Sequence, residues 1–335
     1  MSEVTPAHPN RRLSRFAAFV AAYTFILITA GALVTGNNAS LSDHTWPTFA
    51  GNVLPAKETF VRGLIYEDTH RILAAVFGVL VIALALWVQF TDRRLWLKLL
   101  AWGVVVATGL QGVVGGVIIL YLRPVLVSML HGVLGQSIFI GAAVIAAATS
   151  PLWEREHGSA GVRSGVVAFR VQCVLATALV FCQLILGAAT RFAYGYFTYL
   201  VVLHVCMAFM IIAAVIWLGM TVAHRYRDVE PLRRGFVRLG WLISAQVFLG
   251  IVAIFANRAR FELELKGRIP EAQFGLELEA PHQFLVLLST AHVAVGAMIL
   301  ITMALVTVRS FHLLRAEPVE EPVAQPANLA RGEAA

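Results

Sequence analysis

The sequence has little charge. Only 13% of its 335 residues are Asp, Glu, Lys or Arg, whereas 59% are hydrophobic, and the mean hydropathy is +0.77. A water-soluble globular protein needs more polar surface than this composition can supply. The composition therefore excludes a soluble globular domain and directs attention to the long apolar runs between the few clusters of charge.

Cysteine is also scarce. The chain contains three, Cys173, Cys182 and Cys206, and all of them fall inside predicted helices. The predicted external loops have none, which excludes a disulfide or a thiol site on that side. We interpret the three as small apolar side chains that are buried within the helices.

Targeting sequences are the third absence. The short segment before the first apolar run leads into 21 apolar residues, which is too long for the core of a signal peptide. No segment rich in Arg and Ser resembles a transit peptide. We therefore expect the plasma membrane of a bacterium rather than an organelle.

What the sequence does have is eight apolar runs of 18 to 27 residues. Each is long enough to cross about 30 Å of hydrocarbon as a helix. The sequence therefore predicts an all-α membrane protein with eight transmembrane helices. The predicted spans are Phe16–Gly36, Glu67–Phe90, Leu99–Leu122, Val125–Thr149, Val166–Thr190, Tyr196–Val222, Leu239–Ala256 and Phe284–Val308.

The basic residues indicate the orientation. If the N-terminus is cytoplasmic, 17 of the 26 Lys and Arg residues lie in cytoplasmic segments and 9 lie on the other side. The positive-inside rule then predicts that both termini are cytoplasmic. The net charge of +7 is thus a topology signal and an attraction to anionic lipid, not a sign of nucleic-acid binding.

The two halves of the chain resemble each other. Matching residues recur 134 and 135 positions apart in two different helices, and each half has four helices that start on the same side. We therefore predict two parallel four-helix repeats related by an axis along the membrane normal. These pairs are His70 with His204 and Gln111 with Gln246, and the ends of the first and fifth spans match at Gly31 and Gly187. We expect the two glutamines to bond between helices rather than to bind substrate. The glycine-rich faces permit either internal packing or self-association.

The predicted spans divide the chain into five parts. They are a cytoplasmic N-terminus (1–15), an N-terminal four-helix bundle (16–149), a cytoplasmic linker (150–165), a C-terminal four-helix bundle (166–308) and a disordered cytoplasmic tail (309–335). Two external loops are long. The first, 37–66, is compatible with a lid, and the second, 257–282, carries an alternating run that fits a short strand or an exposed arm.

Four histidines carry the functional signal: His70, His131, His204 and His292. They lie in the second, fourth, sixth and eighth spans, which all run in the same direction, so the rings can lie at a similar depth near the outer face. Ionisable residues inside a bilayer are costly and point to function. Two imidazole pairs predict two haems. Zinc or copper is the main alternative, but zinc usually needs three or four converging ligands. A purely hydrogen-bonding role is the remaining alternative.

The two halves differ beside the first histidine. Glu67 precedes His70 by three residues and so shares its helix face, but the matching position before His204 is Val201. This difference favours a working site in the N-terminal half and a permanent cofactor in the C-terminal half. Alternatively, Glu67 only complements a helix N-terminus. The external arginines are expected either to bind haem propionates or to extend to lipid headgroups; they are Arg71, Arg123 and Arg191.

The motif Glu67-x-x-His70-Arg71, together with the loop motif Trp46-Pro47 and the three later histidines, resembles the haem A synthase family. The resemblance implies oxidation of a methyl group of haem O to the formyl group of haem A, for use by terminal oxidases. It implies that His204 and His292 carry a haem b cofactor. Some members have a cysteine pair in the first external loop, which this sequence lacks.

The resemblance also implies that substrate haem lies between His70 and His131, with Glu67 near the reacting edge. We expect a haem O synthase and an electron-transfer protein as partners, besides the lipid bilayer. A non-enzymatic dihaem b electron carrier is the main alternative. A haem or solute transporter is a third, although the polar groups gather near one face and offer no path across the membrane.

Overall fold

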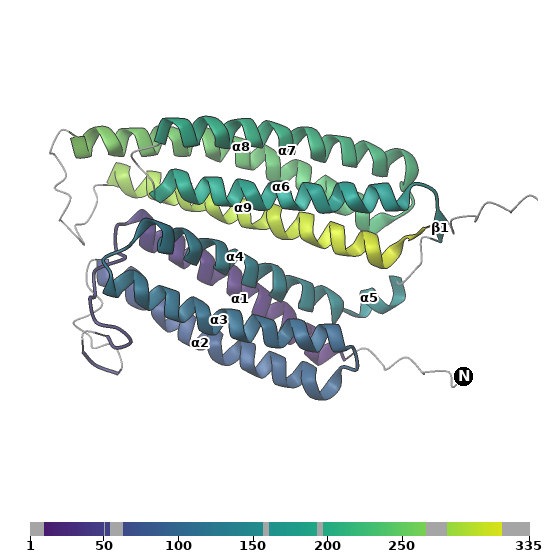
Figure 1. The fold of residues 1–335 in the computed structure, drawn as a ribbon, viewed down its shortest axis with the longest axis horizontal. Coiled ribbons are helices and arrows are strands. Elements are labelled where there is room, and N and C mark those ends of the chain that lie inside the picture. The colour runs from purple at the N-terminus through teal and green to yellow at the C-terminus, as the bar shows by residue number, and fades with distance from the viewer. Residues whose placement is uncertain are drawn as a thin grey trace, which may run out of the picture.

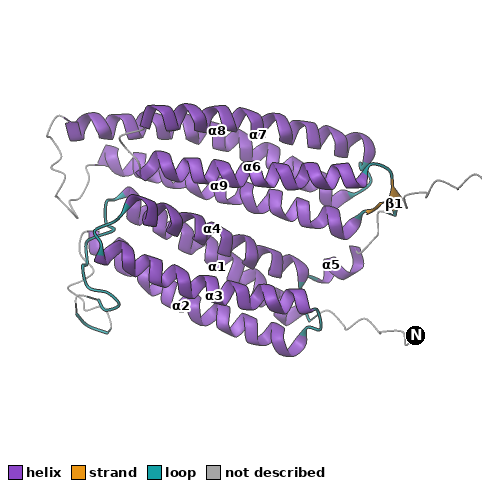
Figure 2. Ribbon diagram, in the orientation of Figure 1, coloured by secondary structure: helices purple, strands orange, loops and turns teal. Residues whose placement is uncertain are grey.

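The computed structural model describes residues 10–49, 51–53, 63–156, 161–192, 197–265 and 280–316. Helices dominate this part of the chain, as Figure 2 shows. They are α1 (Arg11–Gly36), α2 (Gly63–Thr91), α3 (Leu95–Leu120), α4 (Val125–Ala148), α5 (Pro151–Glu156), α6 (Val166–Phe192), α7 (Phe197–Arg225), α8 (Glu230–Leu265) and α9 (Ala280–Leu313). Two short strands, β1 (Val162–Arg163) and β2 (Arg315–Ala316), complete the description.

Eight of these helices, all except α5, are long and apolar enough to cross a membrane. Each contains one of the spans expected from the sequence or coincides with it to within a few residues. At most 39% of the residues in any apolar window are buried inside the molecule. Apolar side chains therefore cover the outside of the helices, as hydrocarbon surroundings require. The predicted fold class of an all-α, eight-helix membrane protein is confirmed.

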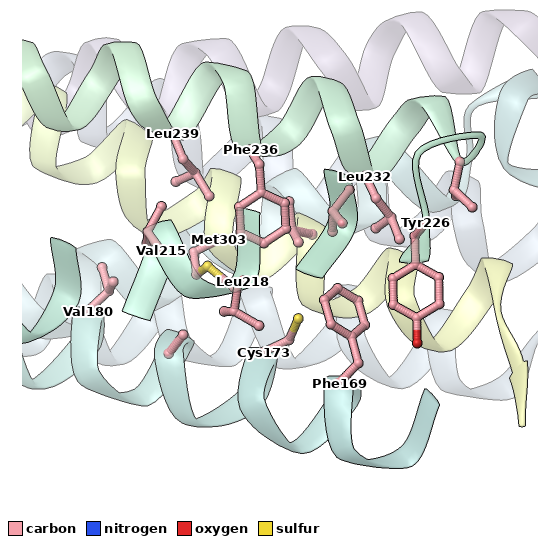
Figure 3. Packing of buried hydrophobic residues seen from close by; sticks show 14 of the residues in the cluster. Phe169, Cys173, Val180, Val215, Leu218, Tyr226, Leu232, Phe236, Leu239 and Met303 are labelled. Atoms are coloured by element: carbon pink, nitrogen blue, oxygen red, sulfur yellow. The ribbon is translucent and has the colours of Figure 1, made fainter. Parts of the chain in front are cut away.

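The helices form two groups that lie side by side, as Figure 1 shows. Helices α1–α4 enclose one apolar core, in which Phe77 and Leu97 are fully buried. Helices α6–α9 enclose a second core around Phe169, Leu218 and Met303, shown in Figure 3. A smaller cluster joins the groups; its buried members are Phe139, Ala143, Ala297 and Ile301.

The cysteines are placed differently from one another. Cys173 is buried in the core of the second group, as expected (Figure 3). Cys182 and Cys206 are exposed on the outer surface of α6 and α7, so the expectation of burial is wrong for these two. A thiol is weakly polar and small, and an apolar helix surface accepts it as readily as a core does.

The segment that joins the two groups of helices, between α4 and α6, contains secondary structure of its own. It lies at the end of the bundle where β1 and β2 are paired. The ring of Trp153 in α5 stacks on His312 of α9, with ring centroids 3.7 Å apart. Strand β1 pairs in parallel with β2. The segment that we expected to be a plain linker, 150–165, therefore contains both α5 and β1.

The ends of the chain's last elements also differ from expectation. Helix α9 continues to Leu313, so the expected tail is helical at its start, and residues 317–335 lie outside the described part. Helix α8 begins at Glu230 and reaches Leu265, well beyond the predicted span Leu239–Ala256. The alternating run that begins at Phe261 is therefore helical up to Leu265, and residues 266–279 lie outside the described part.

Candidate functional site

The four predicted histidines come together as two pairs. The rings of His70 (α2) and His131 (α4) have centroids 6.5 Å apart, at an interplanar angle of 66°. The rings of His204 (α7) and His292 (α9) have centroids 6.4 Å apart, at 59°. A metal bound between two imidazoles needs a bond of about 2 Å on each side, plus about 1 Å from each nitrogen to its ring centre, or about 6 Å in all. Both pairs fit one such metal.

The depth of the first histidine differs from expectation. The predicted span placed His70 only three residues inside its helix, but α2 begins at Gly63, seven residues before it. His204 is likewise seven residues from the start of α7, and His131 is six from the start of α4. At 1.5 Å per residue these positions lie about 10 Å along each helix. Three of the four histidines therefore share a similar distance from the helix start.

Each histidine ring lies against a glycine of the preceding long helix. A Cβ atom added to that glycine would lie 3.0 to 3.3 Å from the ring atom Cε1, which is closer than ordinary contact. In all four cases Nδ1 is nearer to this position than Nε2 is. The facing pairs are Gly31 with His70, Gly115 with His131, Gly187 with His204, and Gly250 with His292. The Cε1–Nδ1 edge of each ring thus fills the space that a missing side chain leaves.

The Nδ1 atoms share a second property. All four are buried, and none has a hydrogen-bond partner within the described residues. Each ring nevertheless lies close enough to interact with a backbone carbonyl of the facing helix, four residues before the glycine. Those carbonyls belong to Leu27, Gln111, Gln183 and Gln246. A metal-ligating histidine usually directs its second ring nitrogen to a carbonyl or carboxylate, so this arrangement suits coordination through Nε2.

Glutamine side chains bind the same helix turns. Nε2 of Gln111 donates to the backbone oxygen of His131 at 2.9 Å, and Nε2 of Gln183 donates to that of His204 at 2.9 Å. Nε2 of Gln246 lies 3.3 Å from Nε2 of His292. The prediction that Gln111 and Gln246 bond between helices is confirmed. Gln183 was not predicted, although the spacing Gln-x-x-x-Gly, which occurs three times in the sequence, could have revealed it.

Glu67 is almost fully buried, with 4% of its surface exposed. One carboxylate oxygen accepts hydrogen bonds from the backbone N–H groups of Ser42, at 2.8 Å, and Asp43, at 3.0 Å. The other accepts from the guanidinium of Arg71 at 2.7 Å. The carboxylate that the sequence placed beside His70 thus also holds the first external loop.

Arg71 fastens the same loop from the other side. Its guanidinium donates to Oδ2 of Asp43 at 2.9 Å, and to the backbone oxygens of Asp43, Thr45 and Thr48 at 2.9 to 3.0 Å. A buried charge is stable only when it is paired and hydrogen-bonded. Glu67, Arg71 and Asp43 meet this requirement together, so they form one anchor for the loop.

The anchored loop reaches the first histidine pair. The indole of Trp46 lies against Gly116 of α3, where an added Cβ atom would come within 2.6 Å of the ring. Gly116 follows Gly115, which faces His131. The expected lid therefore packs onto the helix that supports one of the histidines.

The three arginines expected near the outer ends behave differently. Arg71 and Arg191 lie close enough to His70 and His292, respectively, for a direct charge interaction. Arg191 of α6 also donates to the backbone oxygen of Ala32 in α1 at 2.9 Å, which links the two helix groups. Arg123 lies in the turn after α3, and its side chain makes no hydrogen bond or ion pair with another described residue. One arginine thus accompanies each histidine pair.

An open pocket of about 270 Å³ lies between α1 and α2. Ala30 and Leu33 line it from α1, and Ile65, Tyr66 and Thr69 line it from α2. Ala30 and Thr69 are the sequence neighbours of Gly31 and His70. The pocket opens to the outer surface, where Ile65 and Thr69 are exposed.

The zinc alternative has no counterpart in the described ranges, where no group of three or more His, Cys, Asp or Glu residues could hold a metal ion. The four histidines instead form two pairs of facing rings. This count matches axial ligation of a planar metal complex, which needs one ligand on each face.

Comparison with known proteins gives a partial match. The chain is 35% identical over 125 residues to the heme A synthase of the bacterium Exiguobacterium sibiricum. The aligned part covers 36% of this chain and about two-fifths (41%) of that protein. No family model matches the chain. The similarity therefore extends over only part of each chain.

Proposed function

We propose that this chain is a membrane oxidoreductase that converts a methyl group of haem O into the formyl group of haem A. His70 and His131 are the iron ligands of the substrate haem, and His204 and His292 hold a haem b cofactor. The observation that carries the proposal is the presence of two imidazole pairs, each spaced for one iron. The partial identity to a heme A synthase supports the reaction class.

The residues of the C-terminal pair fit a haem b. The Nδ1 atoms of His204 and His292 are buried, the rings lie close to backbone carbonyls, and the facing glycines Gly187 and Gly250 leave room for the rings. This arrangement leaves Nε2 as the donor to iron. A haem b held there would supply one-electron redox chemistry.

The N-terminal pair has the features of a site that a substrate enters. Glu67 and Arg71 hold the first external loop, and Trp46 brings that loop onto α3 next to the glycine that faces His131. Such a cover excludes water from the reacting edge. Oxidation of a methyl group releases protons, and the buried carboxylate of Glu67 belongs to the residue three positions before His70, on the same helix face. We assign Glu67 the role of orienting the loop and handling these protons.

We further propose that both termini are cytoplasmic and that the histidine pairs lie toward the outer face of a bacterial plasma membrane. Of the 26 Lys and Arg residues, 17 lie in segments on the same side of the predicted spans as the two termini, and this excess supports the orientation. Arg71 and Arg191, which lie near His70 and His292, would then bind propionates at the external interface.

The test is expression of the chain in cells that supply haem O, followed by chromatography of the extracted haems. The proposal predicts a new haem that carries an aldehyde. Glu67→Gln should keep the spectrum of the bound haem b and lose most of the product. Glu230→Gln is the matched control, because Glu230 binds only exposed arginines at the opposite end of the bundle. A normal yield of haem A from Glu67→Gln would eliminate the role assigned to Glu67.

A dihaem electron carrier is the second candidate, and the close similarity of the two pairs favours it. Their centroid distances differ by only 0.1 Å, so the geometry alone would allow both to be loaded permanently. The same chromatography separates the two functions. A carrier would yield two unmodified haems per chain and no aldehyde.

A further inference from the structure

The four histidines face similar helices, but one of those helices differs. In α3, α6 and α8 the residue four positions before the facing glycine is a glutamine: Gln111, Gln183 and Gln246. In α1 the same position, four residues before Gly31, is Leu27. The His70 ring therefore faces a helix turn that has a carbonyl but no amide side chain.

The amide groups occupy a fixed place on the histidine helices. Nε2 of Gln111 lies 3.3 Å from the position that a Cβ atom of residue 135 would take, and Nε2 of Gln246 lies 3.1 Å from that of residue 296. Gly135 and Gly296 each follow their histidine by four residues, one helix turn further on. The missing side chains thus make room for the amide beside the turn that carries the histidine.

The amides restrain that turn. Gln111 and Gln183 each donate a hydrogen bond of 2.9 Å to the backbone oxygen of the paired histidine. The Oε1 atoms of all three glutamines are buried and accept no hydrogen bond from the described residues. Gln111 and Gln183 therefore act on the histidine turns through their amide nitrogens.

The contact at Gln246 has a consequence for iron binding. Its amide nitrogen lies 3.3 Å from Nε2 of His292, the nitrogen that iron would take. The amide can turn to the backbone oxygen of His292, as Gln111 and Gln183 do with their histidines, because Gly296 leaves the same space that Gly135 leaves. The two glutamines of the C-terminal half can then restrain both ligands of that pair.

We propose that Gln111, Gln183 and Gln246 are positioning residues that hold His131, His204 and His292 as iron ligands, and that Leu27 leaves His70 the least restrained of the four. The C-terminal pair, with two amides, retains its haem. The N-terminal pair, with one, binds a haem that exchanges, as a substrate and its product must. The inference rests on the proposed function, because it takes haem as the ligand of both pairs.

The experiment isolates each pair and follows haem release. His204→Ala with His292→Ala leaves only the N-terminal pair, and His70→Ala with His131→Ala leaves only the C-terminal pair. Both proteins are loaded with ferric haem b in detergent and mixed with excess apomyoglobin, and the transfer is followed in the Soret band. Release from the N-terminal pair should be at least tenfold faster than release from the C-terminal pair.

Single substitutions then test the amides. In the N-terminal background Leu27→Gln should slow release about five- to tenfold, the factor that corresponds to one net hydrogen bond. In the C-terminal background Gln183→Leu should accelerate release by a similar factor. Ile26→Gln, which adds an amide on the exposed side of α1, and Gln172→Leu, which removes one elsewhere on α6, are the matched controls.

A second readout separates positioning from a loss of stability. The g values of the low-spin ferric EPR signal depend on the orientation of the two imidazole planes. Gln183→Leu should shift them, and Gln172→Leu should leave them as they are. Unshifted g values in Gln183→Leu would show that its amide does not set the ring orientation and would overturn the inference.

The outcomes are distinct. Equal release rates for Leu27→Gln and Ile26→Gln, or for Gln183→Leu and Gln172→Leu, would overturn the inference and leave the proposed function intact. If Leu27→Gln does not fold, the comparison on α6 decides alone. Failure of both isolated pairs to bind haem would overturn the inference together with the proposed function.

Discussion

A single methyl group added at Gly187 tests how closely the protein is fitted to its second histidine pair. The new Cβ atom of Gly187→Ala would lie 3.1 Å from Cε1 and 3.7 Å from Nδ1 of His204. Carbon atoms in good contact are about 3.5 to 4.0 Å apart, so the ring must move by about 0.5 Å. Metal sites tolerate deviations of about 0.2 Å from ideal bond lengths. The displacement exceeds that tolerance, so it should weaken coordination by His204.

The expected effect is a loss of about 10- to 100-fold in the affinity of the C-terminal pair for haem b, the range found when groups that orient metal ligands are altered. The measurement is a haem titration of the purified protein in detergent, followed in the Soret band. Gly112→Ala is the control, because a Cβ atom there would meet nothing within 4 Å. That control should bind haem normally and, because alanine favours helix, gain up to about 1 kcal/mol in stability.

Thermal melts by circular dichroism show whether either variant is misfolded. If Gly187→Ala is folded and binds haem as tightly as the unchanged protein, the ring of His204 does not depend on this glycine. The reasoning about all four facing glycines would then be refuted.

Three further predictions concern the loop and the core. Gly116→Ala should displace Trp46 from α3, because the added atom would come within 2.6 Å of the indole, and should lower the free energy of unfolding by about 1–3 kcal/mol. Proteolysis of the first external loop should become faster, and an unchanged rate would contradict this packing. Arg71→Lys should also speed that cleavage, because one ammonium cannot replace a guanidinium that spans two carboxylates and three backbone oxygens. Cleavage of Arg71→Lys no faster than that of the unchanged protein would argue against the anchor. Thr307→Val should lower the free energy of unfolding by about 1–2 kcal/mol, because it removes the hydrogen bond of 3.1 Å to the backbone oxygen of Cys173, while the haem spectrum stays the same. An unchanged midpoint of thermal unfolding would be inconsistent with that bond.

The membrane spans could be predicted because a helix that crosses hydrocarbon must be apolar over about 20 residues, and this requirement is visible in composition alone. The ends could not. Helix α8 runs from Glu230 to Leu265, well beyond its apolar span. A helix can extend out of the membrane through charged residues, and a search for apolar runs does not detect that part. The same limit hid the start of α2 at Gly63, which made His70 look shallow.

The pairing of the histidines could be predicted from topology, since alternate helices run in the same direction. The residues that contact the histidines and Glu67 could be predicted from the sequence only in part. Gln183 stands in a spacing that recurs in the sequence, so it could have been found. The partners of Glu67 could not, because Ser42 and Asp43 lie in a loop that folds back over 24 to 25 residues without any periodic pattern. Long-range loop contacts of this kind depend on the tertiary structure.

The most direct test of the account is the haem content of the purified chain after loading with excess haem b. We predict two haems per chain, both low-spin with two axial imidazoles, and one haem when His204 and His292 are both replaced by alanine. An unchanged Soret band and an unchanged haem-to-protein ratio in that double variant would contradict the claim that the histidines act as two iron-binding pairs.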